Sequence, residues 1–152
     1  MKLVILSDTH GLLRPEVLGY LQDADVILHG GDINKQSVLD QLQQYAPLYV
    51  VRGNNDKEWA AALPHELKFS LAEKTFFMVH NKRNLPADLS GVDVVVFGHS
   101  HRYLQQEKDG ILWLNPGSCG PRRFDQEITL MTAELDSEGL RVKKIVIPHR
   151  PR

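Results

Sequence analysis

Short apolar runs recur along the first two thirds of the chain and predict its strands. They cover residues 3–6, 26–28, 48–51, 76–79 and 94–97, and they are rich in Val, Ile and Leu. Runs this short, with β-branched residues and Gly or Pro nearby, are typical of buried strands. Residues 15–22, with an early Pro, and residues 36–45, apolar at helical spacing, predict helices between them. The resulting order predicts a sheet covered by helices.

The second half of the chain favours strands over helices. Further strands are expected at residues 67–71, 75–79, 103–107, 111–114, 128–135 and 141–147, with hairpin turns at 108–110 and 136–139. A two-layered mixed β-sheet core, or β-sandwich, flanked by helices accommodates both halves, so the predicted fold class is α/β. The sequence contains no internal repeat and no linker-like stretch, which predicts one domain over residues 1–152.

Each of the five early apolar runs ends at polar residues. The first is followed by Ser-Asp-Thr-His, and the others by His-Gly-Gly-Asp, Arg-Gly-Asn-Asn-Asp, a lone His, and Gly-His-Ser-His. Ligands of open α/β sheets bind just beyond the carboxyl ends of the strands. We therefore expect seven side chains to meet at one rim: Asp8, His10, Asp32, Asn54, His80, His99 and His101.

These seven side chains are a typical set of metal ligands. Imidazole, carboxylate and amide oxygen suit divalent ions such as Mn²⁺, Ni²⁺, Co²⁺, Fe²⁺ and Zn²⁺, and the set is large enough for two ions that share a carboxylate. The pairs Asp8/His10 and His99/His101 are spaced so that extended backbone would point both side chains to one side. The glycines between the ligand candidates would let the backbone approach the ions.

The ordered motifs resemble the calcineurin-like metallophosphoesterase superfamily. These motifs are Asp-x-His, Gly-Asp, Gly-Asn-x-Asp, a lone His and Gly-His-x-His. Within the superfamily, the chain is similar to the small prokaryotic phosphodiesterases. That subgroup has a later motif that resembles residues 115–118 followed by Pro121 and Arg122. The resemblance implies a phosphodiesterase with two metal ions, Mn²⁺ foremost, in which a metal-bridging hydroxide attacks phosphorus. It also implies a ligand split. Asp8, His10, Asp32 and His101 would hold one ion, and Asp32, Asn54, His80 and His99 the other, with Asp32 as the bridge.

Two positions depart from the family pattern. Phosphoprotein phosphatases of the superfamily carry a proton-donating His directly after the metal-binding Asn, where this chain has Asn55, and many relatives have Gly where it has Asn81. An amide cannot act as a general acid at neutral pH, so we predict a preference for leaving groups that are stable anions. Asp56 could orient neighbouring groups or cap a helix that begins near Lys57.

The composition limits the cellular compartment and the binding partners that we expect. Lys and Arg number 18 against 19 Asp and Glu, for a formal net charge of −1, so no general attraction to nucleic acid is expected. The single cysteine, Cys119, cannot form an intramolecular disulfide, and the N-terminal apolar run is too short for a signal peptide. We expect a cytoplasmic protein with a small phosphate ester as substrate and no membrane partner; homo-oligomerisation is left open.

Several alternatives stay open on the sequence alone. Any one of the seven side chains could be an ordinary loop residue. Residues 115–118 could form a simple Pro-Gly turn or a loop that closes over the metals, Arg122 and Arg123 could bind phosphate or only solvent, and Cys119 fits packing better than catalysis. The rival functions are an inactive interaction scaffold of the same fold, a phosphomonoesterase, and a metallohydrolase of another ester or amide.

Overall fold

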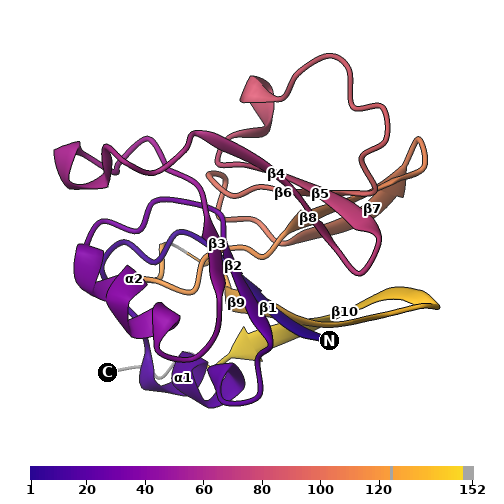
Figure 1. The fold of residues 1–152 in the computed structure, drawn as a ribbon. Coiled ribbons are helices and arrows are strands. Elements are labelled where there is room, and N and C mark those ends of the chain that lie inside the picture. Colours follow the sequence, from indigo (N-terminus) through magenta and orange to yellow (C-terminus); the bar gives the residue numbers. More distant parts are fainter. Residues whose placement is uncertain (124, 149–152) are drawn as a thin grey trace.

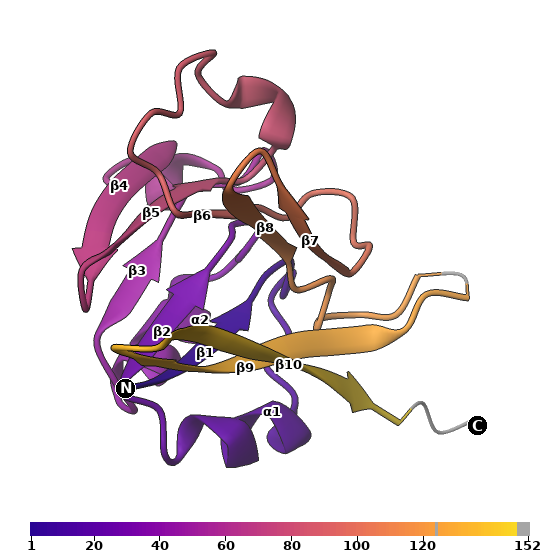
Figure 2. The ribbon, with the colours of Figure 1, turned by 90° about the vertical axis from the view of Figure 1, so that its right-hand side faces the viewer.

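Two five-stranded mixed sheets form the core of the computed structural model, which describes residues 1–123 and 125–148 (Figure 1). The first sheet has the strand order β10-β9-β1-β2-β3 and the second has the order β4-β5-β6-β8-β7. Figure 2 shows the two sheets as two layers, with the helices at the first layer. The predicted two-layered mixed β-sheet core with flanking helices is confirmed.

The first sheet combines parallel and antiparallel strands. Its strands are β1 (Lys2–Leu6), β2 (Val26–His29), β3 (Leu48–Val50), β9 (Ile128–Asp136) and β10 (Gly139–Ile147). β1, β2 and β3 run parallel, whereas β9 pairs antiparallel with both β1 and β10. Because Leu6 pairs with His29 in register, the chain leaves β1 and β2 at the same edge of the sheet.

The second sheet has a parallel centre between two hairpins. Its strands are β4 (Glu66–Leu71), β5 (Lys74–Val79), β6 (Val94–Val96), β7 (Leu104–Lys108) and β8 (Ile111–Asn115). β5, β6 and β8 run parallel, while β4 pairs antiparallel with β5 and β7 with β8. The predicted turn between β7 and β8 is present, and both Asp109 and Gly110 have positive φ, as a type I′ turn requires.

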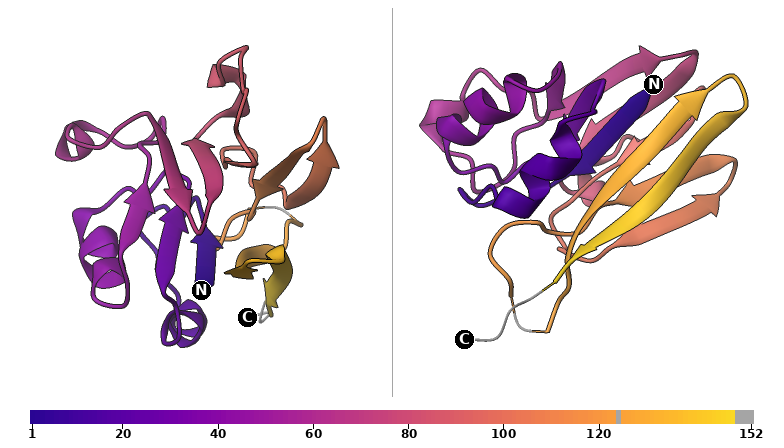
Figure 3. Two further views of the ribbon diagram at one scale, coloured as in Figure 1. Left: turned by 45° about the vertical axis from the view of Figure 1, so that its right-hand side comes forward. Right: turned by 90° about the horizontal axis from the view of Figure 1, so that it is seen from below.

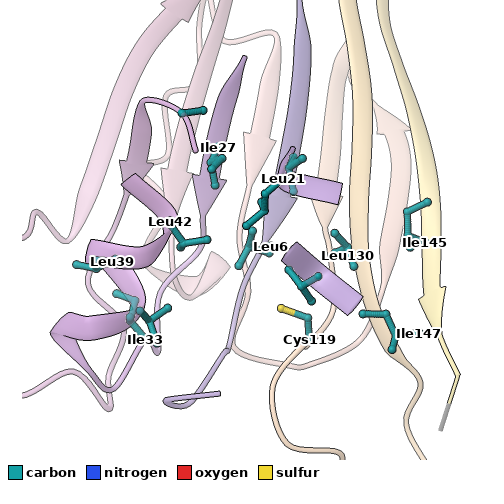
Figure 4. Packing of buried hydrophobic residues seen from close by; sticks show 14 of the residues in the cluster. Leu6, Leu21, Ile27, Ile33, Leu39, Leu42, Cys119, Leu130, Ile145 and Ile147 are labelled. Atoms are coloured by element: carbon teal, nitrogen blue, oxygen red, sulfur yellow. The ribbon is translucent and has the colours of Figure 1, made fainter. Parts of the chain in front are cut away.

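The helices cover the outer face of the first sheet (Figure 3). They are α1 (Pro15–Leu21) and α2 (Gln36–Gln43), and two 3-10 turns follow at η1 (Glu58–Ala60) and η2 (Lys82–Asn84). In β1, Val4 and Leu6 pack toward the helices, whereas Leu3 and Ile5 pack in the cluster that joins the two sheets. Figure 4 shows the helix side, where Leu6, Leu21 and Leu42 meet. A strand buried on both faces explains the continuous apolar run.

Candidate metal centre

The polar segments that follow the strands meet at one edge of both sheets. Backbone hydrogen bonds connect them: the N–H of Asp8 donates to the carbonyl of Gly31 at 2.9 Å, and the N–H of Gly98 donates to the carbonyl of His80 at 2.9 Å. The first bond joins the segments after β1 and β2, and the second joins those after β5 and β6. The structure therefore brings together the strand-end segments that carry the predicted ligands.

The expected extended backbone at the paired ligands is wrong. β1 ends at Leu6 and β6 at Val96, so both pairs lie outside strands. Five of the seven predicted ligands have left-handed φ values: Asp8 55°, His10 45°, Asp32 58°, His99 73° and His101 62°. This conformation costs an L-residue about 1–2 kcal/mol and persists only where surrounding contacts impose it. Tight turns, rather than strand alternation, direct these side chains toward one another.

Asp8, His10 and His101 form the first group of possible metal ligands. Oδ1 of Asp8 lies 3.3 Å from Nε2 of His101 and 3.8 Å from Nε2 of His10. The two Nε2 atoms lie 3.3 Å apart. One ligand atom from each of the three residues lies within 4.8 Å of the others, which is compact enough for a single ion to contact all three.

Asp8, Asp32 and His80 form a second group that overlaps the first. Nε2 of His80 lies 3.2 Å from Oδ2 of Asp32 and 3.8 Å from Oδ1 of Asp8. Oδ2 of Asp32 is also 3.8 Å from Nε2 of His10. Both carboxylates therefore lie between the histidines of the two groups, and Asp8 is common to both.

Three buried atoms of the ligand residues have no hydrogen-bond partner among the described residues. They are Oδ1 of Asp8, Nε2 of His80 and Nδ1 of His101. Nδ1 of His80 donates to the carbonyl of Gly30 at 2.7 Å, so in neutral His80 the lone pair of Nε2 faces the carboxylates. Buried polar atoms are nearly always paired, and a cation between these lone pairs would pair them. The donor set fits a divalent ion.

The charges at the centre shift the ionisation of its members. Burial opposes ionisation of Asp32, but His80, the N–H of Asn55 and His10 together lower its pKa to about 2. For His80 the same burial is outweighed by Asp32 and Asp8, so its pKa is raised. For His10 burial dominates, and its pKa is lowered despite both carboxylates. The two Asp-bearing turns therefore form an anionic site that attracts cations.

Asn54 and His99 lie beside the two groups rather than in them. The N–H of His99 donates to Oδ2 of Asp8 at 3.2 Å, and its exposed ring packs edge-on against His80 with centroids 5.3 Å apart. Asn54 is exposed and lines a groove of about 760 Å³ together with His80 and Asn81. The structure thus brings five of the seven predicted side chains together and places the other two at the margin.

Asn55 and Asp56 support the centre from the segment after β3. Asn55 donates its backbone N–H to Oδ1 of Asp32 at 2.9 Å and its side-chain amide to Oδ2 at 3.2 Å. The buried carboxylate of Asp56 accepts four backbone N–H groups, from Asp32, Ile33, Asn34 and Gly53. It does not cap η1, which has no side-chain cap, so its role is to hold the two ligand-bearing loops together.

Close backbone approaches explain two glycines of the motifs. A Cβ atom at Gly53 would overlap the backbone nitrogen and Oδ1 of Asp32, and one at Gly98 would overlap Oγ of Ser7 and lie 2.6 Å from Oδ2 of Asp8. At these two positions the backbone lies directly against residues of the centre, while its approach to an ion stays a prediction.

Three polar residues behind the centre, Ser7, His29 and Ser118, were not among the predicted ligands. Oγ of Ser7 donates to Oδ2 of Asp8 at 2.7 Å, and Oγ of Ser118 donates to the Asp8 carbonyl at 2.9 Å. His29 is completely buried; its Nδ1 accepts the N–H of Gly31 at 3.0 Å, so its Nε2 donates to Thr9 at 3.1 Å. Burial lowers the pKa of His29 to about 4, which keeps it neutral. The motif at residues 115–118 thus braces the Asp8 turn from behind.

Two further candidates, Arg122 and Cys119, lie outside the two ligand groups. Nε of the exposed Arg122 donates to the carbonyl of Gln126 at 3.1 Å, within its own loop. Cys119 is fully buried in the cluster beneath α1, and burial raises its pKa to about 12. A thiol with this pKa is not a nucleophile at neutral pH, in agreement with a packing role.

Comparison with known proteins places the chain in a family. Residues 1–138 match the sequence model of the calcineurin-like phosphoesterase superfamily domain. A probable metallophosphoesterase of Methanothermobacter thermautotrophicus is 31% identical, over 92% of this chain and 89% of the relative. The chain therefore belongs to the calcineurin-like phosphoesterase superfamily, and the predicted family and its hydrolase class are confirmed.

Two further proteins show the range of this likeness. The phosphodiesterase YfcE of Escherichia coli is 31% identical over 78% of this chain and 79% of its own. Vps29 of Entamoeba histolytica, crystallised with Zn²⁺, has the same fold with a TM-score of 0.72 at 20% identity, covering 96% of this chain and 99% of its own.

Within the described residues, no helix has the length and apolar character needed to cross a bilayer.

Proposed function

We propose that this protein is a binuclear metal-dependent phosphodiesterase, with Mn²⁺ as the preferred ion and the cytoplasm as its location. The observation that carries the proposal is the pair of overlapping ligand groups, Asp8/His10/His101 and Asp8/Asp32/His80, in which Oδ1 of Asp8 and Nε2 of His80 are buried without a hydrogen-bond partner among the described residues. The family resemblance implies that His99 and Asn54 would join Asp32 and His80 at the second ion. When bound, the ions would activate a water molecule and neutralise charge on the phosphoryl oxygens.

The residues of the chain would position both the ions and the ester. Asn55 orients Asp32 through two hydrogen bonds, and Ser7 orients Asp8. The carbonyl of Gly30 keeps the proton of His80 on Nδ1, away from the centre. Such partners fix ligand geometry in metal sites. The 31% identity to YfcE, named a phosphodiesterase, supports diesters as the substrate class.

The absence of a proton donor at Asn55 limits the leaving groups. Its amide is committed to Asp32 and has no ionisable proton at neutral pH. We expect aryl phosphodiesters to be hydrolysed much faster than simple alkyl diesters, because an aryl oxide departs without protonation. Equal rates on methyl p-nitrophenyl phosphate and dimethyl phosphate would contradict this expectation.

A substrate panel on metal-stripped protein tests the proposal. Mn²⁺ is added back, and bound metal is counted while bis(p-nitrophenyl) phosphate, p-nitrophenyl phosphate and p-nitrophenyl acetate are compared. We expect two ions per chain and metal-dependent activity highest on the diester. Asp32→Asn should lose bound metal and activity, whereas Asp40→Asn, on the exposed side of α2, should keep both.

The alternatives predict different results in the same panel. A phosphomonoesterase would favour p-nitrophenyl phosphate, and a metallohydrolase of carboxylic esters would favour p-nitrophenyl acetate. A folded protein that binds no transition ion would fit the scaffold alternative. The likeness to Vps29 does not decide between an enzyme and a scaffold, because it shows only a shared fold. Any of these three results would overturn the proposal.

A further inference from the structure

A basic pocket adjoins the candidate metal centre on the side of His99. It has a volume of about 520 Å³ and is lined by residues 81–83, 97–100, 102–104 and 115. Lys82 and Arg83 come from η2, which begins two residues after His80, and Arg102 directly follows His101. The wall shared with the centre is His99, whose ring packs against that of His80. A substrate bound at the centre can therefore extend into this pocket.

The three cations of the basic pocket are not neutralised. No Asp or Glu is among the described lining residues. Lys82, Arg83 and Arg102 are exposed, and none forms an ion pair with a carboxylate in residues 1–123 and 125–148, where the pairs outside the centre involve Arg141 and Lys144. Of the three side chains, only that of Lys82 has a partner within the described part of the chain: its Nζ lies 5.8 Å from the centroid of the Phe97 ring.

The groove on the other side of the centre lacks this charge. It is lined by one arginine, Arg52, and one acid, Glu66. The guanidinium of Arg52 is already occupied, since it donates to the carbonyls of Asp56 and Lys57 at 3.0 and 3.1 Å. Of the two grooves beside the centre, only the basic pocket therefore carries free positive charge; the exposed Arg123, whose charge acts on His10, lines neither groove.

We infer that the basic pocket binds a second phosphate group of the substrate, and this inference rests on the proposed function. A simple diester has one negative charge, which the metal centre itself would balance. Three further cations exceed what that charge needs, and Arg in particular suits bidentate contact with a dianionic phosphate. The substrate class is thus a small phosphodiester with an additional phosphomonoester on one of its alcohols.

A matched pair of substrates tests the inference. The p-nitrophenyl ester of thymidine 5′-phosphate is compared with the same ester carrying a 3′-phosphate. We expect the 3′-phosphate to raise kcat/KM about tenfold, mainly through KM, and added salt to reduce this gain. The triple variant Lys82→Ser/Arg83→Ser/Arg102→Ser should lose the gain yet hydrolyse the unphosphorylated ester at a rate within about twofold of wild type.

A charge-matched control separates local from general electrostatics. Lys57→Ser/Lys68→Ser/Lys108→Ser removes the same charge from exposed positions outside the basic pocket and should keep the gain. Arg102→Ser alone, a milder change, should retain part of it. A gain that survives the pocket triple variant, or is absent in wild type, would overturn the inference.

Binding provides a readout that does not depend on turnover. Calorimetry with Mn²⁺-loaded protein should show thymidine 3′,5′-bisphosphate binding about tenfold more tightly than thymidine 5′-phosphate, with the difference lost in the pocket triple variant. A protein that hydrolyses no diester but shows this difference would refute the proposed function and keep the basic pocket. Hydrolysis of diesters with no difference in binding would refute the pocket alone.

Discussion

The ligand residues of the centre depend on hydrogen-bond partners that the sequence around each ligand does not reveal. Asp8, Asp32 and His101 have left-handed backbone conformations, and the carboxylate of each Asp accepts a hydrogen bond from a neighbouring side chain. An unpartnered turn would relax to a less strained conformation. The hydrogen bonds behind the ligands therefore belong to the site as much as the ligands themselves.

Asn55→Ala tests this dependence at Asp32. The variant removes the side-chain hydrogen bond at 3.2 Å but keeps the backbone bond at 2.9 Å. Loss of such a partner typically weakens metal binding 10–100-fold, so we expect a drop of about that size in Mn²⁺ affinity. Titration of metal-stripped protein measures it. Gln41→Ala, an exposed amide on α2, should leave the affinity unchanged, and an unchanged affinity in Asn55→Ala would refute the role.

Connecting elements, more than the sheets, set the geometry of the centre. The loop after β2 and the loop after β3 have no strand pairing at the site, and Asp56 joins them with four N–H···O bonds. One carboxylate thus fixes the backbone on both sides of Asp32. The sheets bring the loops near each other, and this buried side chain aligns them.

Asp56→Ala should destabilise the fold even without metal. Removing the carboxylate leaves four backbone N–H groups without their acceptor, and we expect a loss of about 3 kcal/mol in the free energy of unfolding. Urea unfolding of metal-stripped protein measures this loss. Asp56→Asn, which keeps one acceptor oxygen, should lose less. Asp40→Ala, on the exposed side of α2, should stay within about 0.5 kcal/mol, and an equal effect at Asp40 and Asp56 would contradict the role of the buried carboxylate.

The sequence predicted where the strands end but not how the chain turns afterwards. Apolar runs followed by Asp or His located the strand ends after Leu6 and Val96 to within a residue, because burial on both faces imposes an apolar sequence. Left-handed φ values at Asp8 or His99 have no comparable signal, since Asp and His occur in every loop conformation. Likewise, the four bonds of Asp56 depend on a second loop whose position only the assembled fold defines.

Two glycines of similar exposure should respond in opposite ways to alanine. A Cβ atom meets no atom within 4 Å at either Gly110, in the β7–β8 turn, or Gly19, in α1, but Gly110 has a φ of +78°. Gly110→Ala should therefore destabilise the protein by about 1 kcal/mol. Gly19→Ala should stabilise it by about 0.5–1 kcal/mol, because Gly loses more backbone entropy in a helix. If both variants shifted the urea midpoint in the same direction, the positive-φ turn assigned at Gly110 would be ruled out.

The whole molecule assembles the centre from both sheets. Asp8 and Asp32 follow strands of the first sheet, whereas His80 and His101 follow strands of the second. No isolated segment can hold either ligand group, so ion binding requires the two layers to be packed together. A bound ion would then stabilise the packed state against unfolding, by an amount that grows with ion concentration.

Acid should destabilise the metal-free protein through His29, which lies within the first sheet. Burial lowers the pKa of His29 to about 4 in the folded state, whereas an unfolded chain has a value near 6.5. Between about pH 6.5 and 4 the unfolded state therefore binds more protons, and stability falls as pH falls, by up to ~3 kcal/mol. Asp32, with a pKa of about 2, adds a loss only below about pH 4. Urea unfolding at several pH values should show a shallower decline of stability in His29→Asn, which has no titrating group and whose amide oxygen can replace Nδ1 as the acceptor for Gly31. Parallel pH profiles for the variant and the wild type would show that His29 is not the group responsible.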